Sequence, residues 1–331
     1  MPSIRPSNRP SNRPSNRPSI RPTISAPRPS RRRARKRVWA DWELYLLLVP
    51  GIATLLLFKY APMYGILIAF QDYRIFDGMA GSPWVGLDNF RKLFSSDDFL
   101  LVLRNTIEIS LLKLVFLFPL PVIAAILLNE LKRMAFRRTV QTVIYLPHFL
   151  SWIIISGLFI DLLSVNGGLV NKLLGHFGIG PIPFFLSNDY FRSVLVATAG
   201  WKETGWSTIV YLAAFATIDP GLYEAARIDG AGRFRQIWHI TLPGISSVVV
   251  LMLILRLGSL FTGDTEQILA MYNSTVYPSS DIIGTYVYRM GLGKQEYSFT
   301  TAVGLFESAI GFVLILSGNF FSRKFLRRGI W

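Results

Sequence analysis

Residues 224–243 read EAARIDGAGRFRQIWHITLP, and this stretch guides the interpretation of the whole chain. Seven of its residues form a spaced pattern: Glu224, Ala225, Ala226, Gly230, Ile240, Leu242 and Pro243. Just before it, Asp219-Pro220 is a typical helix start, with Asp as the N-cap and Pro in the first turn. Gly230 and Gly232 allow the chain to reverse. We therefore expect residues 219–243 to form two short helices joined by a glycine break.

The two expected helices differ in character. Two adjacent alanines keep one face of the first helix shallow, so that it could lie in a cleft on a partner. Glu224 and Arg227 are three residues apart and could form an ion pair across one turn. Arg233, Arg235 and His239 add basic side chains to the second helix, which we expect to end at Leu242-Pro243. An ordinary surface loop with one amphipathic helix is the alternative.

The rest of the chain is rich in apolar segments. Of its 331 residues, 51% are hydrophobic and 14% aromatic. Several apolar stretches are about 20 residues long, the length that crosses a bilayer as a helix. The sequence therefore predicts an all-α integral membrane protein with about six spanning helices, near residues 44–70, 106–129, 139–163, 192–218, 244–262 and 301–321.

Basic residues orient these expected spans. Lys and Arg number 23 in residues 1–43, 130–141, 216–243 and 322–331, but only 7 in residues 71–104, 165–189 and 265–299. Because basic loops stay in the cytosol, we expect both termini and the 219–243 hairpin to be cytosolic. The net charge of +15 is concentrated at the N-terminus and in alternate loops, which argues against nucleic acid as a partner.

The N-terminal segment differs from the membrane domain expected over residues 41–331. Residues 3–22 are five copies of Ser-(Ile/Asn)-Arg-Pro, so we expect residues 1–40 to be a disordered basic segment. The basic run at residues 31–37 is expected to fix the topology and to contact anionic membrane lipid. The chain has no cysteine, which excludes a disulfide framework, a thiolate zinc site and a cysteine nucleophile.

The spaced pattern resembles the coupling loop of ATP-binding-cassette importer permeases. Further motifs resemble the carbohydrate-importer branch, and more narrowly the polysaccharide and acidic-oligosaccharide subgroup that includes alginate importers: Tyr60-Ala61-Pro62-Met63-Tyr64-Gly65, Val85-Gly86-Leu87-Asp88-Asn89-Phe90, Tyr145-Leu146-Pro147-His148-Phe149 and Thr285-Tyr286-Val287-Tyr288. The resemblance covers roughly residues 40–331. It implies the type I importer permease fold, in which two homologous chains of about six helices surround a central pathway.

The resemblance also implies partners and a location. The partners are a second permease chain, two ATP-binding-cassette ATPase subunits and a periplasmic solute-binding protein. The second permease chain is expected to differ from this one. The location is a bacterial inner membrane. ATP and Mg would bind the ATPase subunits, and this chain would hold no cofactor. The residues implied in ATPase coupling are Glu224, Ala225, Ala226, Arg227, Asp229, Gly230, Ile240, Leu242 and Pro243.

Charged side chains inside the expected spans are candidates for a substrate pathway. Lys59, Lys113, Lys202, Glu203 and Arg256 fall within spans, where charges should face the bundle interior or water. Lys202 lies about 15 Å below the external end of its span and Arg256 about 20 Å above the cytosolic end of its span, so we expect both near the membrane centre. Glu203 could neutralise Arg256. The two interpretations are a structural ion pair or a partly cationic pathway suited to a polyanionic sugar.

Aromatic residues near these charges complete the pathway candidates. Trp201 and Trp206 could stack on pyranose rings, although core or lipid packing is the commoner role. The His148 side chain could bond a carbonyl freed by Pro147, or contact ligand. The histidines lie on separate elements, so no metal site is expected.

Two other classes of protein fit the sequence less well. An intramembrane enzyme is disfavoured because the sequence lacks G-x-S-x-G, H-E-x-x-H and P-loop motifs. A secondary transporter or another channel without an ATPase partner is the remaining alternative, but such transporters often contain inverted repeats, whereas this chain has one distinctive cytosolic loop.

Overall fold

The structure is a computed structural model that describes residues 42–261 and 264–326. These residues are mainly helical, and the bridge between Gln71 and Trp84 is their only β pairing. The expected disordered segment at 1–40 lies outside the described residues. The chain divides into two compact units, Met1–Met63 and Tyr64–Trp331.

The part of the first unit that the structure describes, from Trp42 on, is helical. α2 (Trp42–Leu55) continues into a wider turn at Leu56–Tyr60, and a tighter helical segment, Ala61–Phe70, crosses the unit boundary. Together they form an apolar helix of 29 residues that matches the first expected span.

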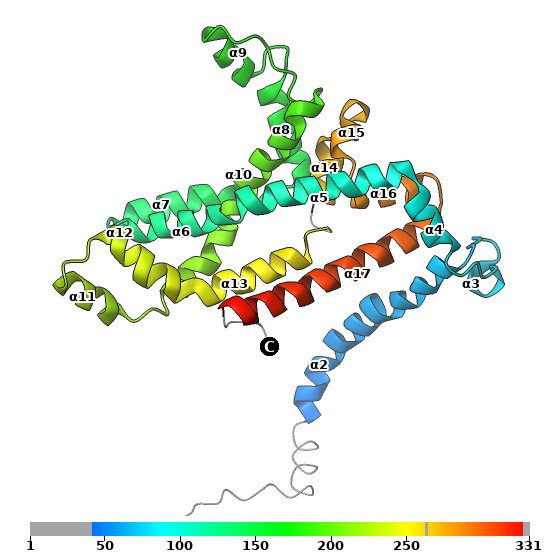
Figure 1. The fold of residues 1–331 in the computed structure, drawn as a ribbon, viewed down its shortest axis with the longest axis horizontal. Helices are drawn as coiled ribbons and strands as arrows, with labels where there is room; N and C mark the ends of the chain where they lie inside the picture. Colours follow the sequence, from blue (N-terminus) through cyan, green and yellow to red (C-terminus); the bar gives the residue numbers. More distant parts are fainter. Residues whose placement is uncertain (1–41, 262–263, 327–331) are drawn as a thin grey trace, which may run out of the picture. The chain divides into compact units, whose positions relative to one another are not determined.

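The second unit is a set of packed helices (Figure 1). Its longer helices are α5 (Asp97–Leu117), α6 (Pro119–Glu130), α7 (Met134–Tyr145), α8 (Trp152–Leu163), α10 (Asn188–Phe215), α13 (Leu242–Gly258) and α17 (Tyr297–Phe321). Its shorter helices are α3 (Gly78–Gly81), α4 (Asp88–Ser95), α9 (Leu169–His176), α11 (Pro220–Ile228), α12 (Arg233–Gln236), α14 (Thr265–Met271), α15 (Tyr277–Ser280) and α16 (Ile283–Tyr288). In Figure 1, α13 and α17 lie side by side. Close packing of the Ile315 side chain of α17 leaves no room for a Cβ at Gly258 of α13.

α10 connects the cores of the second unit. Its first half packs Phe191 and Leu195 against buried residues of α5, α8 and α14. Its second half packs Tyr211 and Phe215 against α6 and α13. A separate core joins α4, α5 and α17 around Phe99. Because α10 contributes to two cores, its side chains reach several neighbouring helices.

A glycine allows α7 to lie close to α10. A Cβ added at Gly205 would lie 1.9 Å from the Ile144 carbonyl oxygen. No side chain can occupy that space, so α10 needs glycine here.

The expected spans correspond to helices, with one correction in shape. Four helical stretches of the described chain are long and apolar enough to cross a membrane: Trp42–Phe70, Asp97–Glu130, Arg233–Gly258 and Tyr297–Lys324. The expected third span is not one straight helix, because Met134–Phe149 and Trp152–Leu163 meet at a bend of 104°. Pro147 lies in a tight turn before the bend, and Ser151 caps α8 by accepting from the Ile154 amide.

The fourth expected span corresponds to α10. With 28 residues, α10 is long enough to cross a membrane, but it is not among the helices apolar enough to be recognised by composition. It contains Arg192, Lys202 and Glu203, whose partners come from other helices. The described helices are therefore consistent with about six spans, although only four or five are evident from length and composition.

Candidate functional site

The first half of the 219–243 hairpin starts as the sequence predicts. Asp219 Oδ1 accepts a hydrogen bond from the Gly221 amide at 2.9 Å, and Pro220 is the first residue of α11. Together they satisfy a free amide and fix the direction in which α11 starts.

A glycine ends α11 and reverses the chain. Gly230 has φ +73°, in the left-handed region, and the Ala231 amide donates to the Ala226 carbonyl at 2.8 Å. This is how helices commonly end at glycine. α12 begins three residues after Gly230, at Arg233. The predicted arrangement of helix, glycine break and second helix is confirmed.

The second half of the hairpin differs from expectation. Leu242-Pro243 does not end the second helix, because the helical stretch runs without a break from Arg233 to Gly258. A wider turn at Ile237–Thr241, which includes Ile240, precedes Pro243. Pro243 has no N–H to donate to the preceding turn. The wider turn shifts the helical hydrogen-bond pattern at this point, so the helix continues through the proline. The hairpin is therefore continuous with α13.

Large apolar side chains stand out from the hairpin into solvent. The exposed fractions are 86% for Ile228, 79% for Phe234 and 61% for Trp238. The Phe234 and Trp238 rings stack with centroids 6.5 Å apart. Exposed apolar groups gathered in this way mark an interaction surface. We call Ile228, Phe234 and Trp238 the apolar tip.

A polar cavity lies behind the hairpin. It has a volume of about 700 Å³ and is lined by residues of α11, α12 and the end of α6, among them Glu224 and Arg227. Arg233 Nη1 lies 3.1 Å from Glu130 Oε2 and ties α12 to α6. Among the described side chains, Glu224 and Arg227 do not form the expected ion pair. Both remain available to other groups.

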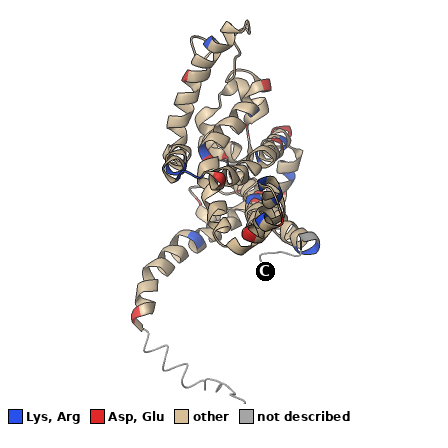
Figure 2. Cartoon of the chain, turned by 90° about the vertical axis from the view of Figure 1, so that its left-hand side faces the viewer, with Lys and Arg blue, Asp and Glu red and all other residues tan. Residues whose placement is uncertain are grey.

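Charged side chains are sparse along the described helices, as Figure 2 shows. The Lys202 ammonium is turned into the protein and donates to the backbone carbonyls of His148, at 3.2 Å, and Leu150. These carbonyls lie at the bend between α7 and α8. Lys202 therefore satisfies two backbone carbonyls at this bend.

The His148 side chain does not take the role we expected. Its Nδ1 is buried and has no hydrogen-bond partner in the described structure, and its ring stacks on Trp206 with centroids 4.5 Å apart. The predicted bond from this ring to a carbonyl freed by Pro147 is therefore not formed, because the ring nitrogen has no partner and the ring stacks on Trp206 instead.

Glu203 and Arg256 meet as predicted. Arg256 Nη1 of α13 lies 3.7 Å from Glu203 Oε2 of α10. Both residues line a pocket of about 230 Å³. Lys202 and Glu203 thus reach different neighbours, as expected of adjacent residues on a helix.

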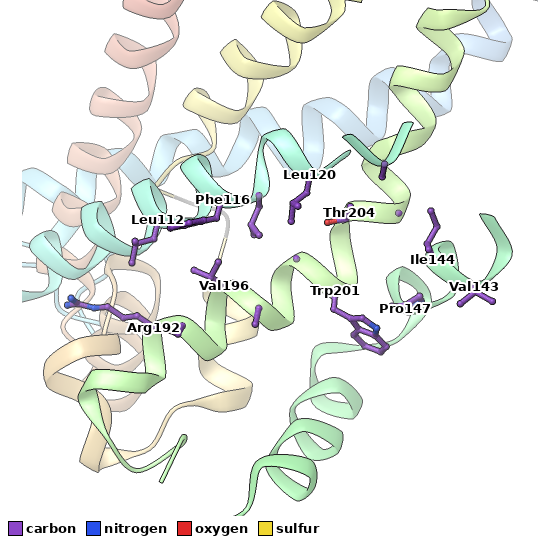
Figure 3. A pocket seen from close by; sticks show the side chains of 16 residues that line it. Leu112, Phe116, Leu120, Val143, Ile144, Pro147, Arg192, Val196, Trp201 and Thr204 are labelled. Atoms are coloured by element: carbon purple, nitrogen blue, oxygen red, sulfur yellow. The ribbon is translucent and has the colours of Figure 1, made fainter. Parts of the chain in front are cut away.

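Trp201 lies in a different place. It lines an apolar cavity of about 690 Å³ between α5, α6, α7 and α10. In Figure 3, Trp201 and Pro147 lie at one end of this cavity and Arg192 at the other. The six pathway candidates therefore separate into a cavity with Trp201, an aromatic stack of His148 and Trp206, the buried Lys202, and the Glu203–Arg256 pocket.

Known proteins share this sequence and fold. Residues 118–328 match the family described as the binding-protein-dependent transport system inner membrane component. The chain belongs to this family. The polygalacturonan/rhamnogalacturonan transport system permease protein of Bacillus subtilis is 46% identical over 302 residues, which cover 91% of this chain and 94% of that protein.

Two solved structures of this kind are also similar. One is the crystal structure of a bacterial ABC transporter involved in the import of the acidic polysaccharide alginate, with 39% identity, TM-score 0.82 and coverage of 88% of this chain and 99% of the other. The second is a bacterial alginate ABC transporter in complex with an alginate pentasaccharide-bound periplasmic protein, with 38% identity, TM-score 0.82 and coverage of 89% and 99%. The resemblance to importer permeases is confirmed.

Family membership makes this chain a transport component and not an enzyme, and the family is an inner-membrane one. Within the described residues, no group of three or more His, Asp or Glu side chains could hold a metal ion.

Sequence reasoning missed the apolar tip of this transport protein. Ile228, Phe234 and Trp238 are ordinary apolar residues in the sequence, and only their exposure together on one short hairpin makes them a candidate surface. Their position next to the glycine break was the available signal, because apolar residues beside a turn between expected spans have no span to occupy.

Proposed function

We propose that this chain is one of two permease subunits of an ATP-driven importer that moves an oligosaccharide or polysaccharide into the cytosol. Family membership supports the importer class, and the similar proteins named for saccharide transport support the substrate class. ATP and Mg would bind partner ATPase subunits, because the sequence has no nucleotide-binding P-loop.

The observation that carries this proposal is the 219–243 hairpin with its apolar tip. An apolar, exposed surface on a basic and hence cytosolic loop suits a soluble partner beneath the membrane. We assign coupling to the ATPase to Glu224, Ala225, Ala226, Arg227, Asp229 and Gly230 of the hairpin, and to Ile240, Leu242 and Pro243, which join it to α13. Because the second half is continuous with α13, movement of the hairpin would be carried into a spanning helix as a rigid body.

The proposal includes further partners. A second permease chain would supply the other half of the pathway, two ATPase subunits would dock on the two hairpins, and a periplasmic binding protein would deliver the sugar. The alginate transporter solved with its periplasmic protein supports the last of these. Both termini of this chain would be cytosolic, as the distribution of Lys and Arg indicates.

An acidic sugar is the proposed substrate. Alginate is an acidic polysaccharide, and polygalacturonan is a polymer of galacturonic acid. A pathway for such a chain needs cationic side chains at membrane depth, and Arg256 is a cation that faces a pocket there.

Reconstitution tests the proposed function. The purified complex in proteoliposomes should take up acidic oligosaccharide only with ATP, and only when the ATPase subunits and the binding protein are present. The permease chain reconstituted alone should transport nothing. Uptake by this chain alone, without ATP, would contradict the proposal and favour a secondary transporter.

A further inference from the structure

The cationic side chains inside the second unit differ in how many of their hydrogen-bond donors find an acceptor in the protein. The Lys113 ammonium, 1% exposed, lies 2.7 Å from Asp264 Oδ1 and also donates to Gln267 Oε1. The Lys202 ammonium donates to two backbone carbonyls. Both groups therefore have close acceptors, as charges removed from water require.

Arg256 is less fully satisfied. Its guanidinium carries five N–H donors, yet its side-chain contact in the described structure is the single approach to Glu203 at 3.7 Å. Well-formed bonds between an arginine and a carboxylate are about 2.7–2.9 Å long and often paired. The side chains of Arg256 and Glu203 remain 36% and 34% exposed. This ion pair is loose, and the guanidinium has donors to spare.

Arg256 lines a pocket whose other residues suit a sugar. The pocket, of about 230 Å³, lies between α6, α10 and α13. Besides Arg256 and Glu203 its lining combines hydroxyl groups with apolar walls, as a sugar with polar edges and apolar faces requires: Thr204, Ser207, Tyr211 and Ser259 supply hydroxyls, and Leu117, Phe118, Met252 and Leu255 supply apolar surface.

Of Lys113, Lys202 and Arg256, Arg256 is the one whose charged group keeps donors for a ligand. Arg256 shares a second space with Lys113 and Asp264, but that space is only about 10 Å³. The pair of Lys113 and Asp264 closes it. An incoming anion would therefore meet Arg256 from the side of the larger pocket, where Glu203 is the competing carboxylate.

We propose that this pocket binds the carboxylate of one uronate unit of an acidic oligosaccharide, with Arg256 as the binding residue and Glu203 as a carboxylate that the sugar displaces. The inference rests on the proposed function and adds the residue that selects acidic over neutral sugars. The planar guanidinium can hold a carboxylate through two parallel hydrogen bonds. A neutral sugar offers no such group, so Glu203 would keep its place.

The two side chains should respond in opposite directions. Arg256→Gln removes the carboxylate-binding group and should lower the apparent affinity for an acidic sugar at least about tenfold, the usual effect of losing a hydrogen bond to a charged group. Glu203→Gln removes the competitor and should raise that affinity. A merely structural ion pair would give the opposite expectation for Glu203→Gln, because both variants would then impair the protein alike.

The test measures uptake by the assembled complex in proteoliposomes, with ATP and binding protein. Trigalacturonate is the acidic probe, and its trimethyl ester is a neutral probe of the same framework. We expect Arg256→Gln to raise KM for trigalacturonate and Glu203→Gln to lower it, with little change for the ester. Arg74→Gln, which removes an exposed ion pair with Asp72 outside the hairpin and the pocket, is the control variant.

The outcomes separate this inference from the proposed function. If the wild-type complex imports neither probe, the proposed acidic-sugar function fails and the inference falls with it. If the wild-type complex imports trigalacturonate but both variants change the two probes equally, or change neither, the Arg256 site is wrong and the importer function stands. The double variant Arg256→Gln/Glu203→Gln has no unpaired charge, and unlike Glu203→Gln alone it should keep a raised KM for trigalacturonate.

Discussion

At the scale of single residues, Gly230 allows the chain to reverse between α11 and α12. Its φ of +73° disfavours any side chain, and Gly230→Ala should cost about 1–2 kcal/mol locally. We expect this variant to weaken sugar-stimulated ATP hydrolysis by the assembled complex. Gly232→Ala is the matched control, since Gly232 has φ −67° and open space around it. Equal activity of the two variants would contradict a role for the reversal in coupling.

Lys202 is the residue on which the bend between α7 and α8 depends. Lys202→Met removes the donor to two carbonyls, and each buried group left unsatisfied costs about 1–3 kcal/mol. We expect a clear loss of thermal stability for the purified protein in detergent. Arg233→Gln should change stability by no more than about 1 kcal/mol, because its ion pair is exposed. A Lys202→Met protein as stable as the control would show that this donor is dispensable.

At the scale of an element, the apolar tip is formed by the end of α11 and the start of the helical stretch that leads into α13. Phe234→Ala with Trp238→Ala should remove most of the aromatic surface available for docking, because large aromatic side chains dominate such contacts. We expect the permease to insert normally but to lose its ATPase subunits on purification. Phe76→Ala, at another fully exposed phenylalanine, should retain them. Retention by both variants would place the docking surface elsewhere.

Elements with local signals were predictable from the sequence, whereas their packing was not. Asp219-Pro220 and Gly230 determine the hairpin through backbone geometry that neighbouring residues carry. The continuous helix through Pro243 depends on the wider turn at Ile237–Thr241, which the residue types there do not predict. The bend near Pro147 and the separation of Trp201 from Arg256 depend on contacts between distant helices. The Glu203–Arg256 pair was predictable because charges inside a membrane need partners.

At the scale of the whole molecule, we interpret the chain as a set of helices that partner ATPase subunits would move through the hairpin. α10 packs into two cores, and the hairpin is continuous with α13, so displacement of the hairpin would reach the Glu203–Arg256 pocket through packed helices. The coupling and the sugar selection are then properties of one connected set of helices, which requires the hairpin to touch the ATPase subunit.

Site-directed crosslinking tests this contact most directly. The chain has no cysteine, so Ile228→Cys introduces a single thiol at the most exposed residue of the apolar tip. In the assembled complex, a short thiol crosslinker should join this position to the ATPase subunit, and membrane-impermeant reagent added outside intact cells should leave it unlabelled. Labelling from outside, or the absence of any crosslink to a nucleotide-hydrolysing subunit, would contradict the account.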